Sequence, residues 1–352
     1  MIMGETVAIS ICYLGRRGGG PKIALQIFQD LKYSKIFTTP TICIRRDNEL
    51  LKRYDQSSVI VLFEDLLSIK TFSKVILYVL APKKLLKDMG LSRGGFCLIP
   101  MISPLGLVIE SILKLQGVTV IRLLHDFERH PGDRWPPNML IRRIIKRSTF
   151  LIALSNGVAS KITNLNPLTK VSVYPHPLFE FSSSEASKEY SRKYILFIGR
   201  IRKYKGIKNL VSAFSSLQLE SIDLVIAGEG KIQQKEDLRI KIINRWLEES
   251  EIHNLIKHAE VIVFPYVEAS QSGLLPYCTN LNKKIVATPL PGLLEQVASY
   301  PNAFITNDFE IDSLAESLRV AVSTEVAPKR SETLKSINIE LCILESGLFP
   351  IK

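Results

Sequence analysis

Residues 261–292 read VIVFPYVEASQSGLLPYCTNLNKKIVATPLPG and combine two short apolar runs with a polar loop between them. The first run, Val261–Phe264, is apolar on both faces and stops at Pro265, which predicts a buried parallel strand. The second run, residues 283–288, predicts another short strand before the PLPG turn. We therefore expect a strand, a helix and a second strand here, which is the repeating unit of a parallel sheet.

A candidate anion site lies between these two runs. Small hydroxyl residues and a glycine, Ser270, Ser272 and Gly273, are typical of the start of a helix. Unpaired backbone amides at such a start, together with the helix dipole, favour a phosphate. We expect Ser272, Gly273 and Leu274 to contribute these amides. Many helices that follow a strand bind nothing, so the interpretation needs a second signal.

Residues 194–210, YILFIGRIRKYKGIKNL, supply that second signal. An apolar strand ends at Gly199 and Arg200, and Lys205 and Gly206 follow before a helix. The planar guanidinium of Arg200 and the mobile ammonium of Lys205 both suit a diphosphate. Scattered surface charges would not explain this arrangement at the end of a strand.

The net charge of +12 lies entirely in the first half of this chain of 352 residues. Residues 1–180 hold 25 Lys and Arg against 13 Asp and Glu, whereas residues 181–352 hold 21 of each class. Residues 139–150 predict an amphipathic helix with its cations on one side: Arg142, Arg143, Lys146 and Arg147. An anionic membrane surface would bind such a helix, and a solvated surface helix is the alternative. Nucleic acid is excluded as a partner, because no binding module is recognisable and aromatic residues do not interleave with the basic run.

Short apolar runs alternate with helical stretches along both halves of the chain. This alternation predicts doubly wound parallel sheets, whose ligands lie at the carboxyl ends of the strands. In the first half we expect strands at residues 7–13, 41–44, 58–63, 75–79, 96–100, 119–124, 150–154 and 171–174. In the second half we expect them at residues 194–198, 224–227, 261–264 and 283–288.

Two loops at these strand ends hold candidate site residues. Gly19 and Gly20 end a glycine-rich loop that permits a close approach of a ligand to the backbone, and a tight turn into a helix explains them equally well. Their spacing misses the dinucleotide-binding fingerprint. His125 and Asp126 directly follow the strand at 119–124, and His130 lies further along the same polar loop. A catalytic or substrate-orienting residue would lie at such a strand end, and an ordinary loop histidine is the alternative.

Other sequence features exclude several classes of protein. The cysteines are scattered and predict buried free thiols rather than a zinc site or disulfides: Cys12, Cys43, Cys97, Cys278 and Cys342. The longest apolar run, at residues 96–109, contains two prolines and is shorter than the ~20 residues that a spanning helix needs. No charged and then apolar leader opens the chain. We expect a cytoplasmic protein.

The spaced motifs of the second half resemble the donor half of a GT-B glycosyltransferase of the family 4 type. They occur in the order Gly-Arg…Lys-Gly, LVIAGEG, FPY, SQSGLLP and KKIVATPLPGLLE, and the resemblance covers residues 193–297 well and the first half in outline. It implies two Rossmann-like domains that face a cleft. It also implies transfer of a sugar from a nucleotide-sugar donor with retention of the anomeric configuration. No DxD-like acidic cluster lies in a site-like loop, so we expect no metal and no other cofactor.

The same resemblance implies roles for single residues. Gly19 and Gly20 would face the donor phosphates, and Trp246 would pass near the nucleotide base, although Trp246 would serve equally well as a core anchor. His125 would lie near the transferred sugar, with Asp126 and His130 on the acceptor side.

The chain departs from this family pattern at one place. Many family 4 enzymes have two Glu separated by seven residues, and neither alignment on Gly273 nor alignment on Glu268 keeps that pair here. Alignment on Gly273 puts Ser270 at the first position and Cys278 at the second. The sequence therefore does not identify the residue that contacts a sugar hydroxyl, and Glu268 and Glu295 are the candidates.

These observations predict a first domain at residues 1–182, a Ser-rich linker at 183–192 and a second domain at 193–352, with a last helix that returns to the first domain. We expect a hexosyltransferase that acts on a polysaccharide or lipid-linked glycan acceptor of the cell envelope, peripheral to the inner face of the membrane. A nucleotide-sugar epimerase of the same architecture is one alternative, which turnover without an acceptor would favour. A non-catalytic nucleotide-sugar binder is the other, because the Glu pair is missing.

Overall fold

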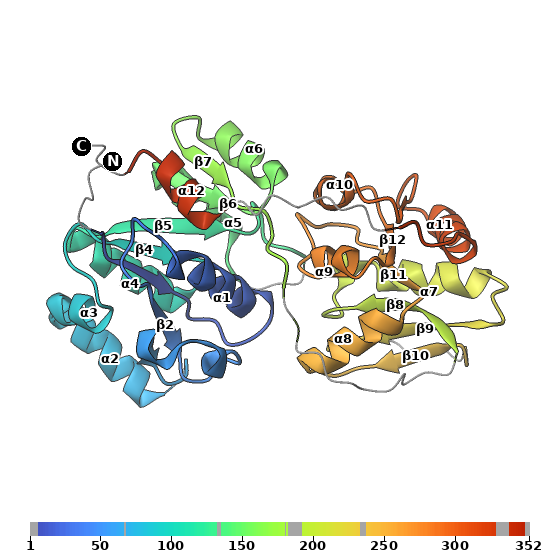
Figure 1. Cartoon of the computed structure of the whole chain (residues 1–352), viewed down its shortest axis with the longest axis horizontal. Coiled ribbons are helices and arrows are strands. Elements are labelled where there is room, and N and C mark those ends of the chain that lie inside the picture. The colour runs from blue at the N-terminus through green and yellow to red at the C-terminus, as the bar shows by residue number, and fades with distance from the viewer. Residues whose placement is uncertain are drawn as a thin grey trace. The chain divides into compact units, whose positions relative to one another are not determined.

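The computed structural model describes residues 6–66, 68–131, 135–179, 181, 192–232, 237–328 and 338–348. The chain divides into two units (Figure 1). Unit 1 comprises residues 1–129, 135–177 and 335–352, and unit 2 comprises residues 130–134 and 178–334. Of the predicted linker at 183–192, all but Arg192 lies outside the described residues.

The sheet of unit 1 has the strand order β3-β2-β1-β4-β5-β6-β7, and all of its pairings are parallel. Its strands are β1 Ile9–Cys12, β2 Thr41–Arg45, β3 Val59–Phe63, β4 Phe96–Ile99, β5 Thr119–Leu124, β6 Phe150–Ala153 and β7 Lys170–Val173. The inner strands β1, β4 and β6 are buried at every position, because helices cover both faces of the sheet. The order reverses between β1 and β4, so the loops that follow these strands flank a crevice at the carboxyl edge.

The helices of unit 1 are α1 Gly19–Lys32, α2 Ile69–Leu80, α3 Pro82–Asp88, α4 Pro104–Leu115, α5 Asn138–Arg147, α6 Asn156–Leu165 and α12 Ile339–Glu345. The chain moves along the sheet in one direction through α1 and in the other from β3 onward. Because parallel crossovers are right-handed, α1 lies on one face and α2 to α6 lie on the opposite face. Consistent with this, α3 packs on α4, and α5 packs on α6.

The sheet of unit 2 has the order β10-β9-β8-β11-β12-β13 and is also entirely parallel. Its strands are β8 Lys193–Ile198, β9 Ile222–Ala227, β10 Ile240–Ile243, β11 Val261–Phe264, β12 Lys284–Ala287 and β13 Ala303–Ile305. Its helices are α7 Ile207–Ser216, α8 Glu249–His258, α9 Leu275–Asn280, α10 Pro291–Val297 and α11 Ile311–Ser323. One hydrophobic core holds β8, β9, β11 and β12 together with the inner faces of these helices. The prediction of two doubly wound parallel sheets is confirmed.

One predicted strand is wrong. Residues 75–79, VILYV, form the second half of α2. The β-branched run favours a strand locally, but Ser68 caps a helix that starts at Ile69, because its side chain accepts a hydrogen bond from the Thr71 amide at 3.1 Å. Once the helix has started, it continues to Leu80. The strands β10 and β13 lie at the two edges of the second sheet and were not predicted from the sequence.

Two helix starts differ from the prediction. Helix α1 begins at Gly19, so Gly19 and Gly20 form its first turn rather than the loop before it. Helix α9 begins at Leu275, after the expected positions of Ser270 and Ser272, and no side chain caps it. The basic helix α5 lies where the sequence predicted it.

The last described helix, α12, belongs to unit 1. It packs against α1 and β7. Ser172 on β7 donates a hydrogen bond to the Glu345 carboxylate at 3.0 Å, and Cys342 lies against the carbonyl of Val173. The contacts of the chain therefore assign residues 178–334 to unit 2 and return its last residues to unit 1.

Candidate functional site

The loops that follow β8 and β11 lie side by side at the carboxyl edge of the second sheet. The strand order of unit 2 reverses between these two strands, which is where an open α/β sheet binds its ligand. The Val267 amide, after β11, donates to the carbonyl of Tyr204, after β8, at 2.9 Å. One sequence signal for a diphosphate, Arg200 with Lys205, lies on the loop after β8, and the other, residues 272–274, lies on the loop after β11. The two signals therefore meet at one crevice.

Glycine makes this close approach possible. Gly206 has φ +67, in the left-handed region, and a Cβ at this position would lie 1.7 Å from the carbonyl oxygen of Pro265. At the next loop, a Cβ on Gly292 would lie 1.7 Å from the carbonyl oxygen of Ser270. Side chains at these positions would push the loops apart, so both glycines determine the shape of the crevice.

Lys205 is held in place by an aromatic ring. Its Nζ lies 3.6 Å from the centroid of Tyr266 and 5.2 Å from that of Tyr204, which is a cation–π arrangement. Tyr266 is buried and contacts Ser272, with 3.3 Å between the two hydroxyl oxygens. Burial raises the pKa of Tyr266, so its ring stays neutral beneath the ammonium. Arg200 is exposed at the end of β8, on the same edge of the sheet.

The loop before α9 contributes fewer amides than its sequence suggests. The Ser272 amide donates to Oε1 of Gln296 at 2.8 Å, and Nε2 of Gln296 donates back to the Ser272 carbonyl at 3.0 Å. This pair of hydrogen bonds fixes the loop to α10 and uses the first of the three predicted amides. Within the described part of the chain, the amides of Gly273 and Leu274 have no hydrogen-bond acceptor. These two amides, rather than three, remain available to an anion.

Within unit 2, Glu268 and His130 lie beside this crevice. The Glu268 carboxylate is half exposed, and its Oε1 lies 3.6 Å from Nδ1 of His130. The imidazole of His130 is stacked on Tyr204, with ring centroids 4.6 Å apart. The structure thus brings together two residues that the sequence assigned to different roles, 138 positions apart along the chain.

The other predicted donor residues lie on neighbouring loops of the same sheet edge. Ser270 packs against the first turn of α10, and Glu295 is exposed on that helix. Trp246 is half buried after β10, the edge strand. Beside it, Arg245 forms an ion pair with Glu251 of α8, with 2.9 Å between Nη1 and Oε2.

The carboxyl edge of the first sheet holds histidines that are neutral. His125 directly follows β5, and its Nε2 donates to the carbonyl of Pro100 at 2.8 Å, which leaves Nδ1 as the unprotonated ring nitrogen. Burial lowers the pKa of His125, and the negative charge of Asp126 partly opposes this shift. His125 is therefore uncharged near neutral pH and can accept a proton.

A second histidine at this edge was missed by the sequence interpretation. His176 follows β7, and its Nδ1 donates to the Pro177 carbonyl at 3.1 Å. Burial lowers the pKa of His176 to about 4, and the hydrogen bond to the Pro177 carbonyl partly opposes this shift. The available signal was the position of His176 just after a strand, the same position that singled out His125.

The glycine loop of unit 1 is explained in part by packing. A Cβ on Gly20 would lie 2.5 Å from the hydroxyl of Tyr13, a buried residue that follows β1, and 2.8 Å from the end of the Met101 side chain. The Gly18 amide before α1 donates to Glu49 at 2.8 Å. Gly20 therefore lets α1 approach the loop that follows β4, which is the other side of the crevice.

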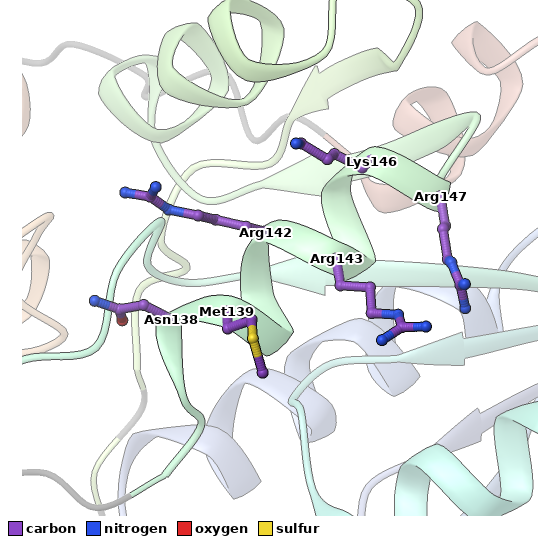
Figure 2. Close-up of a pocket in the computed structure, with 6 residues that line it drawn as sticks. All are labelled: Asn138, Met139, Arg142, Arg143, Lys146 and Arg147. Carbon is purple, nitrogen blue, oxygen red and sulfur yellow. The ribbon is translucent and has the colours of Figure 1, made fainter.

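The cations of α5 line an open hollow of about 530 Å³ on the surface of unit 1 (Figure 2). Its lining is Asn138, Met139, Arg142, Arg143, Lys146 and Arg147. Arg142 forms an ion pair with Glu128 at 3.1 Å. In the ranges that the structure covers, no acidic side chain pairs with Arg143, Lys146 or Arg147. Ile141 and Ile145 are buried on the opposite side of the helix, so the predicted amphipathic pattern is confirmed.

Among the residues that the structure describes, no three His, Cys, Asp or Glu side chains are grouped so that they would hold a metal ion. No described helix is both long and apolar enough to pass through a bilayer. All five cysteines are buried free thiols, as predicted.

Two doubly wound parallel sheets with ligand crevices at their carboxyl edges make this a GT-B protein. Residues 179–337 match the family model for glycosyl transferases group 1. The matched residues hold nearly all of unit 2.

Several solved structures and a curated relative are also similar to the chain. A glycosyltransferase from Rickettsia africae is 16% identical with a TM-score of 0.66, over 98% of this chain and 96% of that one. Anabaena HepE in complex with UDP-glucose is 13% identical with a TM-score of 0.66, over 90% of each chain. A GDP-mannose:glycolipid 4-beta-D-mannosyltransferase from Xanthomonas campestris pv. campestris is 24% identical over 184 residues, which are 50% of this chain and 51% of the relative. The match spans about half the length of the curated relatives.

Proposed function

We propose that this protein is a glycosyltransferase that moves a hexose from a nucleotide-sugar donor to a glycan or lipid-linked acceptor without a metal ion. The observation that carries the proposal is the crevice between β8 and β11, where Lys205 is fixed on Tyr266 beside two available amides. The match to glycosyl transferases group 1 covers this crevice. HepE, a protein of the same fold, has been solved with UDP-glucose.

The proposed chemistry follows from the leaving group. When the bond between sugar and diphosphate breaks, negative charge develops on the diphosphate oxygens. Lys205 and Arg200 supply positive charge there, and the amides of Gly273 and Leu274 donate hydrogen bonds. Cations held in position before the reaction stabilise the transition state without reorganisation, which is the role that a metal ion takes in other transferases.

Glu268 is the stronger candidate for the contact to a sugar hydroxyl. It lies on the loop after β11, next to the Tyr266 that supports Lys205, and it has His130 as a neighbour at 3.6 Å. Glu295 is the second candidate and lies on α10. We propose His125 and Asp126 for the acceptor side, because His125 is neutral and has an unprotonated nitrogen.

We propose retention of the anomeric configuration, on the family 4 resemblance alone. The name of the Xanthomonas relative describes a 4-beta-D-mannosyltransferase, so the anomeric configuration of the product has to be measured. The anomeric proton of the product, followed by NMR from the first minutes of the reaction, reports this configuration.

The name of that relative also includes a glycolipid acceptor. A glycolipid acceptor agrees with our proposal that the protein acts at the inner face of the membrane.

The first experiment is a thermal-shift titration with UDP, GDP, ADP and dTDP. A nucleotide at ~100 times its dissociation constant should raise the free energy of unfolding by roughly 2.7 kcal/mol. Lys205→Met and Arg200→Ala should each weaken the binding of that nucleotide at least about tenfold. Lys208→Met, an exposed lysine on α7, is the matched control and should bind as wild type. No shift with any of the four nucleotides would contradict the proposal.

The second experiment separates transfer from the alternatives. The protein is incubated with the sugar nucleotides of the base that binds, with and without a lipid extract as acceptor. Transfer requires the acceptor, an epimerase converts the donor without one, and a non-catalytic binder leaves the donor unchanged. Glu268→Gln and Glu295→Gln are compared in the same assay, and we expect the larger loss of turnover from Glu268→Gln with nucleotide binding intact.

A further inference from the structure

Helix α2 of unit 1 exposes its apolar side. Ile69 is 84% exposed, Phe72 68% and Leu80 79%, and Ile76 and Val79 are also exposed. These positions have the spacing of one helical face, so they form a continuous outer stripe. Amphipathic helices of globular proteins normally place such a stripe toward the core. Here the stripe of Ile69, Phe72, Ile76, Val79 and Leu80, called the α2 stripe below, is exposed instead.

The opposite side of α2 explains why the helix cannot turn the stripe inward. Thr71 and Tyr78 are its two buried residues. The Thr71 hydroxyl donates to the Asp65 carbonyl at 2.6 Å, and the Tyr78 hydroxyl donates to the Asp88 carboxylate at 3.1 Å. Rotation of α2 would break both hydrogen bonds and expose the Tyr78 ring, which packs against Phe63 with 6.2 Å between centroids. The orientation is therefore fixed by the fold.

The charges around the α2 stripe are almost all positive. Helices α2 and α3 carry five lysines, Lys70, Lys74, Lys83, Lys84 and Lys87, and one acidic residue, Asp88. Asp88 is already engaged by Tyr78 and by Lys84, whose Nζ lies 3.3 Å away. Long lysine side chains next to an apolar stripe can extend to the lipid headgroups while the stripe enters the acyl region.

We propose that α2 lies in the interfacial layer of a bilayer that contains anionic lipids, with the α2 stripe inserted and its lysines at the headgroups. The 12 residues of α2 span about 18 Å, which suits a helix in the plane of the membrane rather than across it. The exposed cations of α5 lie on the same face of the first sheet, because right-handed crossovers place α2 to α6 together. This surface is distinct from the nucleotide crevice, so the inference does not depend on sugar transfer.

A second copy of the chain is a poorer occupant of this surface. In a symmetric dimer the same patch faces itself. Two α2 stripes in contact would bring the lysines of α2 and α3 of both copies together, with no described acidic residue of these helices left to neutralise them. Like charges that face each other weaken binding between two copies, whereas anionic headgroups strengthen the binding of this surface to a bilayer.

The test measures vesicle binding of the full chain by co-sedimentation. Vesicles of phosphatidylcholine, with and without phosphatidylglycerol, are compared. The double variant Phe72→Ser and Leu80→Ser should lower the partition coefficient on phosphatidylglycerol vesicles at least about tenfold, because two large apolar side chains no longer enter the membrane. The double variant Leu168→Ser and Leu238→Ser removes two leucines that are 89% and 88% exposed elsewhere, and it should bind as wild type.

A second measurement detects insertion directly. In Phe72→Trp, fluorescence should be quenched by brominated lipids more strongly than in the wild type, whose two tryptophans are Trp135 and Trp246. Equal vesicle binding of the stripe variant and the wild type would overturn the proposal. Loss of self-association in the stripe variant, without a change in vesicle binding, would overturn it in favour of a dimer. The nucleotide thermal shift serves as the fold control, since the stripe variant should retain it in full.

Discussion

The two units share a topology but carry their positive charge in different ways. In each sheet the strand order reverses beside the first strand, and loops at the carboxyl edge form a crevice. In unit 2, where acidic and basic residues balance, Lys205 is fixed in the crevice by Tyr266. In unit 1, which contains most of residues 1–180 and hence most of the positive charge, the crevice has neutral histidines and the cations lie on outer helices. Net charge therefore indicates the outer surface of unit 1, whereas local geometry indicates the site of unit 2.

The largest expected effect tests whether the crevice of unit 2 depends on close backbone contact. Gly206→Ala places a Cβ 1.7 Å from the Pro265 carbonyl oxygen at a left-handed φ of +67. We expect the free energy of unfolding to fall by more than about 3 kcal/mol, with loss of nucleotide binding. Denaturant unfolding and the thermal-shift titration measure the two effects.

Unit 1 provides the control for this substitution. Gly157 lies exposed in the first turn of α6, and a Cβ there would meet no atom within 4 Å. Gly157→Ala should raise the free energy of unfolding by about 0.5 kcal/mol, because alanine favours a helix over glycine. Equal changes in the free energy of unfolding for Gly206→Ala and Gly157→Ala would show that the close approach of Gly206 to Pro265 does not contribute to stability.

The second prediction separates the roles of the two crevices. His125→Ala should lower turnover about a hundredfold if the neutral imidazole accepts a proton or orients the acceptor. Its nucleotide dissociation constant should stay at the wild-type value, whereas Lys205→Met should raise that constant. His258→Asn, on α8 of unit 2, is the control. Steady-state kinetics with saturating donor tests this, and weaker nucleotide binding by His125→Ala would assign His125 to the donor instead.

The third prediction concerns the pH dependence of unit 1. The folded-state pKa of His176, about 4, lies below the ordinary value of 6.5, so the unfolded chain takes up the proton first as the pH falls. Stability from the neutral imidazole is complete above pH 6.5 and is lost between 6.5 and about 4. This amounts to roughly 2 kcal/mol of unfolding free energy between pH 7 and pH 5.

Replacement of the imidazole tests this directly. In His176→Asn, the fall in unfolding free energy from pH 7 to pH 5 should be smaller than in the wild type by that amount, measured by urea denaturation at both pH values. His258→Asn in unit 2 controls for the loss of any histidine. The same fall in His176→Asn and the wild type would contradict the assignment.

The smallest expected effect lies at the edge of unit 2. Glu251 accepts hydrogen bonds from Arg245 and from the Glu248 amide at the start of α8. Arg245 holds the pKa of Glu251 below its ordinary value. Glu251→Gln should lower the free energy of unfolding by about 0.5–1 kcal/mol, with a smaller loss at high salt. A loss that is independent of salt would show that capping, rather than charge, dominates.

The sequence predicted those parts of the fold that have a local pattern. Buried parallel strands are apolar on both faces. The predicted bounds of Val261–Phe264 and Thr119–Leu124 are therefore the same as those of β11 and β5 in the structure. The edge strands β10 and β13 are partly exposed, and they lack such a run. Residues 75–79 were assigned to a strand because a short β-branched run does not reveal the period of the helix around it.

The candidate site shows the same limit. Arg200, Lys205 and His125 were chosen because polar residues that follow a strand meet at one edge of a parallel sheet. The sequence could not show that Gln296 binds the Ser272 amide across 24 positions, or that Tyr266 holds Lys205. His176 was missed because its burial, which makes it neutral, depends on residues distant in the chain.

The sequence by itself determined the alternation of strands and helices, the loops that hold the site and the half that holds the charge. These properties depend on the period and the order of residues along the chain. Only the tertiary structure decided which backbone amides stay available, which histidines are neutral and that the α2 stripe lies outward. Each of these depends on contacts between distant segments. Thr71 and Tyr78 take the inner side of α2, and the apolar residues of that helix are left outside.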